Sequence, residues 1–331
     1  MIRQAFFASI ALLALGVSLA LAQEGPITVY NAQHETLAQE WATGFTEETG
    51  IPVIIRQGSD LEVANQILQE GANSPADVFL TENSPGMVLV DNAGLFEPLP
   101  RDILDAVPAQ FRPENGNWTG IAARSTVFAY NKDSLGEADL PKTMAELADP
   151  AWQGRWAASP SGADFQAIVA AYLVLEGEAA TLEWLQGMAA NAVIVRGNRA
   201  ALAAANNGEV DGALIYHYYW FGDQAGTGES SANTSLHYFG AHDPGAFVSI
   251  SGGGVLASSQ HKEEAEAFLR FITTKGQDVL RDGSSYEYAI GVDHESNAAL
   301  PPLNDLGAPQ IDPTRLDTVK AAELMTEAGL L

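Results

Sequence analysis

The chain has 331 residues and no cysteine, and its 42 acidic residues outnumber its 16 basic ones, which gives a formal net charge of −26. Without cysteine the chain can form no disulfide and no thiolate metal site, so any bound metal must be held by oxygen and nitrogen. The negative charge excludes nucleic acid and anionic membranes as natural partners. The length predicts two lobes, each with its own core.

Residues 1–22 have the pattern of a secretory signal peptide. Arg3 precedes an apolar run from Ala5 to Leu21, and Ala20-Leu21-Ala22 forms an A-x-A motif, so we expect cleavage after Ala22. A retained transmembrane anchor is the alternative, but the run is short for a span and no basic cluster follows it. We therefore expect a secreted chain with no membrane insertion after cleavage.

Strand-like and helical patterns then alternate. Residues 27–31 read as a strand, 35–49 as a helix ended by Gly50, 51–58 as a strand, 61–71 as a helix and 76–82 as a third strand. This order is typical of an open α/β sheet, in which ligand groups lie at the carboxyl ends of the strands. His34 and Glu82 follow the first and third of these strands, so we expect both side chains in one crevice.

The remaining segments complete a two-lobed α/β pattern. Residues 118–135 read as extended chain around Arg124, long enough to cross between lobes, and 246–258 as a strand that returns to the first lobe near Val248. Between them lie a helix at 143–148, a strand at 155–158, helices at 163–176 and 180–189, and a strand–loop–helix–strand run at 191–215; helices follow at 261–274 and 317–331. We expect a first lobe of residues 23–125 plus 247–298 and a second lobe of residues 126–246 plus 299–331.

Tyr218 and Tyr219 lie just beyond the apolar strand Ala213–Ile215. Adjacent tyrosines most often pack, but their place at a strand's carboxyl end makes them candidate ligands. A hard, highly charged cation prefers phenolate, carboxylate and imidazole, and it lowers the pKa of a group that it binds. Two phenolates and Glu82 match the charge of Fe(III), with His34 neutral.

Ser161, Gly162 and Ala163 open a helix after a strand. Backbone N–H groups at such a helix start bind anions, although Ser161 also fits the role of an ordinary N-cap. Asn198 and Arg124 supply further donors. An anion held here would fill coordination positions that the protein leaves open.

Several short segments, taken together and in order, resemble one family. They are ITVYNAQHE, PADVFLTEN, ARSTVFAYN, SPSGADF, RGNRAAL, ALIYHYYW and HDPGAFVSISGGGVLASSQHKEEAEAFLRFI. They resemble the periplasmic ferric-ion-binding proteins of bacterial iron ABC transporters, across nearly the whole mature chain. The resemblance implies a type II periplasmic-binding-protein fold, in which each lobe is an open mixed sheet flanked by helices and the lobes are joined by crossing hinge strands. It implies the Fe(III) ligands His34, Glu82, Tyr218 and Tyr219, and a synergistic anion held by Ser161, Gly162, Ala163, Asn198 and Arg124.

The sequence departs from the family pattern at two positions. Asn83 stands where phosphate-using members often have Gln, and Tyr216 stands where they often have Asn. Both positions normally help to hold the anion, so the choice between carbonate and phosphate stays open. Tyr216 and Asn83 are candidate accessory residues, and packing is the alternative role for Tyr216.

Three other functions compete with iron capture. The same fold could bind a polyamine, thiamine, a phosphonate or a sugar. A secreted hydrolase is disfavoured because the chain has no H-E-x-x-H, no G-x-S-x-G and no cysteine nucleophile. A structural envelope protein would not need the ligand set. The resemblance implies a monomeric, non-enzymatic periplasmic protein that delivers Fe(III) to an ABC transporter permease.

Overall fold

The computed structural model describes residues 25–331, so the predicted signal peptide lies outside the described residues. Within this range, no helix is both long and apolar enough to cross a bilayer. The strands of the described chain are β1 (Ile27–Asn31), β2 (Val53–Gln57), β3 (Val78–Leu80), β4 (Thr119–Asn131), β5 (Trp156–Ala158), β6 (Ala192–Ile194), β7 (Gly212–Tyr216), β8 (Thr234–His237) and β9 (Val248–Val255). The helices are α1 (Glu35–Thr49), α2 (Asp60–Glu70), α3 (Pro85–Asn92), α4 (Arg101–Asp105), α5 (Ala163–Glu176), α6 (Glu178–Asn191), α7 (Asn198–Asn206), α8 (His217–Ala225), α9 (Lys262–Thr273), α10 (Gln277–Asp282) and α11 (Thr318–Glu327).

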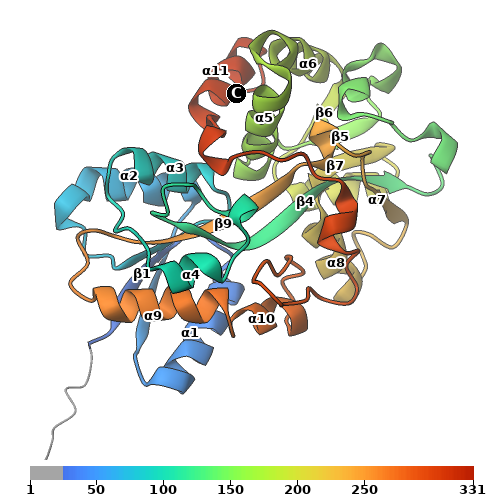
Figure 1. The fold of residues 1–331 in the computed structure, drawn as a ribbon. Helices are drawn as coiled ribbons and strands as arrows, with labels where there is room; N and C mark the ends of the chain where they lie inside the picture. The colour runs from blue at the N-terminus through green and yellow to red at the C-terminus, as the bar shows by residue number, and fades with distance from the viewer. Residues whose placement is uncertain (1–24) are drawn as a thin grey trace, which may run out of the picture.

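The strands form one mixed sheet that runs through two lobes. Its order is β2-β1-β3-β9-β4-β7-β5-β6, and β8 pairs with the far half of β4. The first lobe has parallel β1, β2 and β3 with antiparallel β9, and the second has parallel β5, β6 and β7 antiparallel to β4. Figure 1 shows β4 and β9 running between the lobes, each of which carries its own helices. The fold is therefore the predicted two-lobed α/β fold.

Strand β4 joins the lobes by changing its partner. Residues up to Ser125 pair with β9, and residues from Thr126 pair with β7. The predicted crossing strand around Arg124 is confirmed as one continuous strand of 13 residues. The lobe boundaries at 125, 246 and 298 stay a prediction, although the change of partner falls next to the first of them.

The helices follow the sequence signals closely. Helix α1 ends at Gly50, whose φ of 79° lies in the left-handed region that glycine adopts without strain. Helix α9, expected at 261–274, buries Ala265, Phe268, Leu269 and Ile272 along one face. Residues Met144–Ala148 form a 3₁₀ helix instead of the expected α-helix, because the Asp149-Pro150 pair ends it after little more than one turn.

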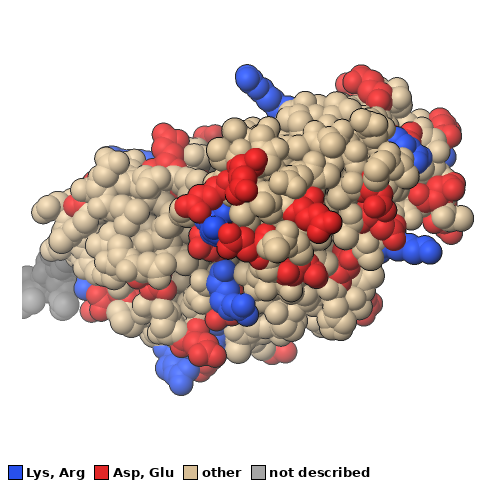
Figure 2. Space-filling model, turned by 90° about the horizontal axis from the view of Figure 1, so that it is seen from above, with Lys and Arg blue, Asp and Glu red and all other residues tan. Residues whose placement is uncertain are grey.

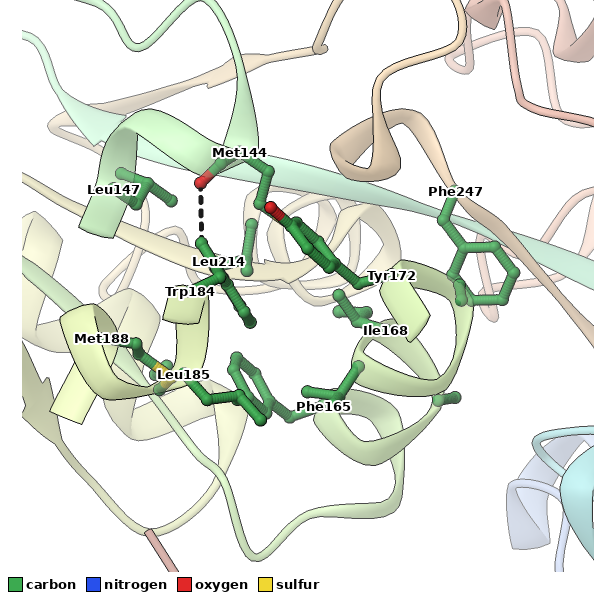
Figure 3. Packing of buried hydrophobic residues seen from close by; sticks show 14 of the residues in the cluster. Met144, Leu147, Phe165, Ile168, Tyr172, Trp184, Leu185, Met188, Leu214 and Phe247 are labelled. Atoms are coloured by element: carbon green, nitrogen blue, oxygen red, sulfur yellow. Dashed lines mark hydrogen bonds between the residues drawn. The ribbon is translucent and has the colours of Figure 1, made fainter. Parts of the chain in front are cut away.

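Each lobe has its own packed core. In the second lobe, Trp184 stacks on Tyr172 and Phe165 and donates its indole N–H to the Met144 carbonyl at 3.0 Å (Figure 3). In the first lobe, α3 packs directly on β9, where a Cβ on Gly252 would come within 2.3 Å of the Met87 side chain. Most acidic side chains lie at the surface, although Asp60, Asp77, Asp164 and Glu287 are buried, and Figure 2 shows the surface ones spread over one face with basic side chains among them.

Candidate functional site

The carboxyl ends of β1 and β3 bring His34 and Glu82 together. The two strands are parallel neighbours, so the residues that follow them leave the sheet at the same edge. Nε2 of His34 lies 3.1 Å from Oε1 of Glu82. Nδ1 of His34 lies 2.9 Å from Oε1 of Glu287, a fully buried residue from a distant part of the chain. The first lobe thus presents an imidazole and a carboxylate side by side.

The paired tyrosines come from the second lobe. They lie in the first turn of α8, one and two residues past the helix start, rather than on the end of β7 itself. The Tyr218 hydroxyl donates to Oε1 of Glu82 at 2.8 Å, so it crosses from the second lobe to the first. The rings of Tyr218 and Tyr219 lie 4.3 Å apart, and the His34 ring lies 4.9 Å from that of Tyr218. The structure brings all four predicted ligands into one cluster.

Asp164 sits at the centre of this cluster, and the sequence analysis did not single it out. It lies in the first turn of α5 and is buried. Its Oδ2 accepts hydrogen bonds from Asn198 Nδ2 at 2.7 Å and from the Tyr219 hydroxyl at 3.0 Å, and the Tyr218 hydroxyl lies 3.3 Å from the same oxygen. Its Oδ1 accepts from Asn83 Nδ2 at 3.1 Å. Asp164 is therefore a fifth potential ligand, and its Oδ2 contacts both tyrosines.

The predicted anion-binding residues divide into two groups. Gly162 is the N-cap of α5 and Ala163 its first residue, next to Asp164, while Ser161 is exposed. Asn198 donates to Asp164. Arg124 is instead fully buried against the first lobe, where its Nη2 contacts Ser251 at 2.6 Å and pairs with Glu287.

The two accessory candidates are buried at the seam between the lobes. Asn83 donates its amide N–H to Asp164 across the seam, and its Oδ1 accepts from Ser249 at 2.7 Å. The Tyr216 hydroxyl lies 3.4 Å from Asn83 Oδ1 and 3.4 Å from the Asp164 carbonyl oxygen. Asn83 and Tyr216 therefore contact Asp164 rather than the cleft ligands, and these contacts connect the two lobes.

The charges of the first lobe are arranged around His34. Burial of the ring disfavours its charged form, but the hydrogen bonds and charges of Glu287 and Glu82 outweigh burial and raise the pKa of His34 to about 10. For Glu82, burial raises the pKa, but His34, Arg124 and the Tyr218 hydrogen bond together lower it to about 2. A cation that binds here would replace the His34 proton.

In the second lobe, the surroundings of Tyr218 and Tyr219 favour the protonated form of both phenols. Burial and the charges of Asp164 and Glu82 raise the pKa of Tyr218 well above its usual range, and the same causes raise the pKa of Tyr219. Burial and the charge of Glu82 raise the pKa of Asp164 to about 7. Without a cation, the phenols of Tyr218 and Tyr219 therefore hold their protons at neutral pH, and they become ligands only when a cation displaces these protons.

The chemistry of the donor set is selective. Among residues 25–331, no group of three or more His, Cys, Asp and Glu side chains is arranged to hold a metal ion. Carboxylate and phenolate oxygens with one imidazole suit a hard, highly charged cation.

Comparison with known proteins agrees with this arrangement. Residues 73–310 match the family described as bacterial extracellular solute-binding protein. The chain is 58% identical to the Fe(3+)-binding periplasmic protein of Serratia marcescens over 99% of this chain and 97% of that one. The chain belongs to this family. It groups with the family's ferric-binding members, as the sequence analysis predicted.

Solved structures of other solute-binding proteins share the fold. The iron-bound HitA structure from Pseudomonas aeruginosa matches with a TM-score of 0.86 and 39% identity, over 92% of this chain and 99% of that one. The Trichodesmium IdiA (FutA) structure, in complex with iron and citrate, matches with a TM-score of 0.80 and 25% identity, over 93% of this chain and 100% of that one.

Two residues of the site in this solute-binding protein escaped sequence reasoning. Asp164 follows the predicted anion-binding turn, but an acidic residue in the first turn of a helix is also the ordinary complement of the helix dipole. Glu287 lies in an irregular segment, 253 residues from the His34 that it contacts. No local pattern marks such a residue, so only the fold reveals its place.

Proposed function

We propose that this protein captures Fe(III) in the cleft between its lobes and delivers it to an ABC importer. The observation that carries the proposal is the hydrogen bond from Tyr218 in the second lobe to Glu82 in the first, at 2.8 Å, beside Tyr219 and His34. These are the donors that a hard trivalent cation prefers, and the proton between phenol and carboxylate is the one that a cation would displace.

Iron and lobe closure are coupled in this proposal. His34 and Glu82 come from the first lobe, and Tyr218, Tyr219 and Asp164 come from the second, so neither lobe holds a full donor set. A ligand that makes more contacts in the closed form shifts the population toward it. An importer that recognises the closed form and separates the lobes would divide the ligands and release the ion.

We infer further that the Asp164 carboxylate fills the coordination position for which an external anion was expected. It lies at the predicted anion-binding helix start and accepts the Asn198 hydrogen bond that an anion would receive. Carbonate or phosphate at a remaining position stays a prediction. The citrate bound to IdiA belongs to that protein.

The competing functions fit the site less well. A polyamine, thiamine, phosphonate or sugar would not need two phenols beside a carboxylate and an imidazole, which are the groups that meet in this cluster. We therefore propose a non-enzymatic, monomeric protein of the periplasm, with an ABC permease as its partner. The acidic surface, with its net charge of −26, fits a soluble carrier that does not bind nucleic acid.

The test is an absorption titration of the mature protein with Fe(III). We expect a visible phenolate-to-iron charge-transfer band that is lost or strongly weakened in Tyr218→Phe and Tyr219→Phe, which keep their fold. Tyr172→Phe is the matched control, because Tyr172 packs in the second-lobe core on Trp184, away from the site. A protein that stays colourless with Fe(III), with or without added anions, would refute the proposal.

A further inference from the structure

We propose that Glu287 is a positioning residue that fixes which ring nitrogen of His34 faces the cleft. The inference rests on the proposed function, because it assigns His34 Nε2 to the iron. Glu287 is far in sequence from the residues of the cleft, because it lies in the irregular segment after α10. It contacts His34 and would not touch the ion itself.

The carboxylate of Glu287 is held in one orientation. Its Oε2 receives the guanidinium of Arg124, with Gln33 Nε2 at 3.3 Å and the Ser251 hydroxyl at 3.4 Å. These three groups occupy one oxygen and leave the other, Oε1, directed at Nδ1 of His34 at 2.9 Å. All of these side chains except His34 are buried. The carboxylate therefore cannot turn away without leaving a buried guanidinium without its counter-charge.

This orientation selects the tautomer of His34. An ionised carboxylate only accepts hydrogen bonds, so Nδ1 must keep its proton, and when a cation displaces the proton on Nε2 the lone pair of that nitrogen becomes available to the metal. Nε2 is the nitrogen that faces Glu82, at 3.1 Å. Histidine ligands in metalloproteins are commonly oriented in this way by a carboxylate on the other ring nitrogen.

The backbone around His34 and Glu287 is anchored for the same geometry. Gln33, which contacts Glu287, also accepts the His34 backbone N–H at 2.7 Å through its Oε1. Tyr288 exchanges two backbone hydrogen bonds with Ala123 of β4, at 2.8 and 3.1 Å. Tyr286 has φ 55°, in the left-handed region that a bulky residue rarely adopts. Such strain persists only where the surroundings hold it, and it occurs often at functional sites.

A purely structural role is the alternative, with Glu287 serving only as the counter-charge of buried Arg124. The two roles differ in one respect. A structural role predicts the same loss of iron affinity whether or not His34 is present, whereas a positioning role acts through His34 alone.

The variant Glu287→Gln separates these roles. Its amide has one acceptor and one donor end, and buried Arg124 and Gln33 require the acceptor, so the donor end must face His34. His34 would then keep its proton on Nε2 and could not bind iron through that atom. We expect a loss of about 10- to 100-fold in Fe(III) affinity, the usual effect of removing such a partner.

The experiment is a double-mutant cycle in the full mature chain, with Fe(III) affinity measured by chelator competition for wild type, Glu287→Gln, His34→Ala and the double variant. We expect Glu287→Gln to add no further loss to His34→Ala. If Glu287→Gln lowers the Fe(III) affinity equally with and without His34, the inference is overturned, while the proposed function of Fe(III) capture still stands. A wild type that binds no Fe(III) would instead refute the proposed function.

Two further measurements separate a defect in folding from a specific loss of iron affinity. Asp77→Asn removes a buried first-lobe carboxylate that caps Thr28 N–H and Ser259 without touching the site, and it should leave iron affinity unchanged. If Glu287→Gln does not fold, ¹⁵N-histidine NMR of the wild type loaded with diamagnetic Ga(III) decides. A proton on Nδ1 with a metal-shifted Nε2 supports the inference, and the reverse assignment overturns it.

Discussion

Asp164→Asn is the substitution that tests most directly how the protein completes its site. Two amide donors approach opposite oxygens of Asp164, from Asn83 at 3.1 Å and from Asn198 at 2.7 Å. A substituted amide offers only one oxygen, so its NH₂ group must face one of these buried donors in either orientation. One buried donor then loses its partner.

The structure sets the size of this effect. A buried donor left without a partner costs about 1–3 kcal/mol, and that penalty alone weakens closure and iron binding by about 5- to 150-fold. The loss of a negative charge beside a trivalent cation acts in the same direction. We therefore expect at least this loss of Fe(III) affinity, together with a new dependence on added carbonate or phosphate, which could enter the vacated position.

The assay is chelator competition for Fe(III) with and without each anion, on wild type, Asp164→Asn and the control Asp243→Asn. Asp243 is a second-lobe acid that caps a short 3₁₀ helix by accepting from Gly245 N–H at 2.7 Å, and it does not touch the site. Unchanged affinity in Asp164→Asn without anions would refute the role of Asp164. A wild type that binds iron only when an anion is supplied would refute it as well.

Two further predictions follow from the protonation of the site and from its packing. Burial raises the pKa of Tyr218 and of Tyr219, and Glu287 and Glu82 raise the pKa of His34, so all three side chains hold protons at neutral pH and Fe(III) must displace three protons on binding. The apparent affinity should then fall about 1,000-fold for each unit by which the pH is lowered. A pH-independent affinity in chelator competition would contradict phenolate ligation. Gly252→Ala places a methyl group within 2.3 Å of the Met87 side chain and should lower the free energy of unfolding by about 1–3 kcal/mol, which thermal unfolding measures. The control is Gly222→Ala, on α8, where an added Cβ would meet open space. Equal stability of the two variants would show that α3 can move away from β9.

The two-lobed architecture and the place of four site residues could be predicted from the sequence, because each of these features depends on a local sequence pattern. His34 and Glu82 follow strands whose apolar pattern is plain, and parallel neighbouring strands place such residues together without further information. Gly50 and the apolar face of α9 carry equally local signals. Tyr218 and Tyr219 were expected at the end of a strand and lie instead in the first turn of the helix that follows it, a shift that leaves their place in the cleft unchanged.

The remaining site residues could not be found in this way because their roles depend on tertiary contacts. Asp164 has the same sequence context as any acid at a helix start, and only the approach of Asn83 from the other lobe distinguishes it. The assignment of Arg124 to the anion stays a prediction; the fold pairs its Nη2 with Glu287, because a buried charge on the crossing strand needs a buried partner, and this pairing could not be read from the sequence. Pairings across such distances in sequence leave no periodic trace.

The partner change of β4 between Ser125 and Thr126 has a consequence for how the protein can be divided. A single continuous strand contributes its first half to one lobe and its second half to the other, and β9 returns beside it. No single cut in the polypeptide can therefore yield two self-sufficient fragments, since each would lack a central strand. Fragments expressed separately should recombine only as a complex, and the crossing strands should be the last amides to exchange with deuterated solvent, even while the cleft opens.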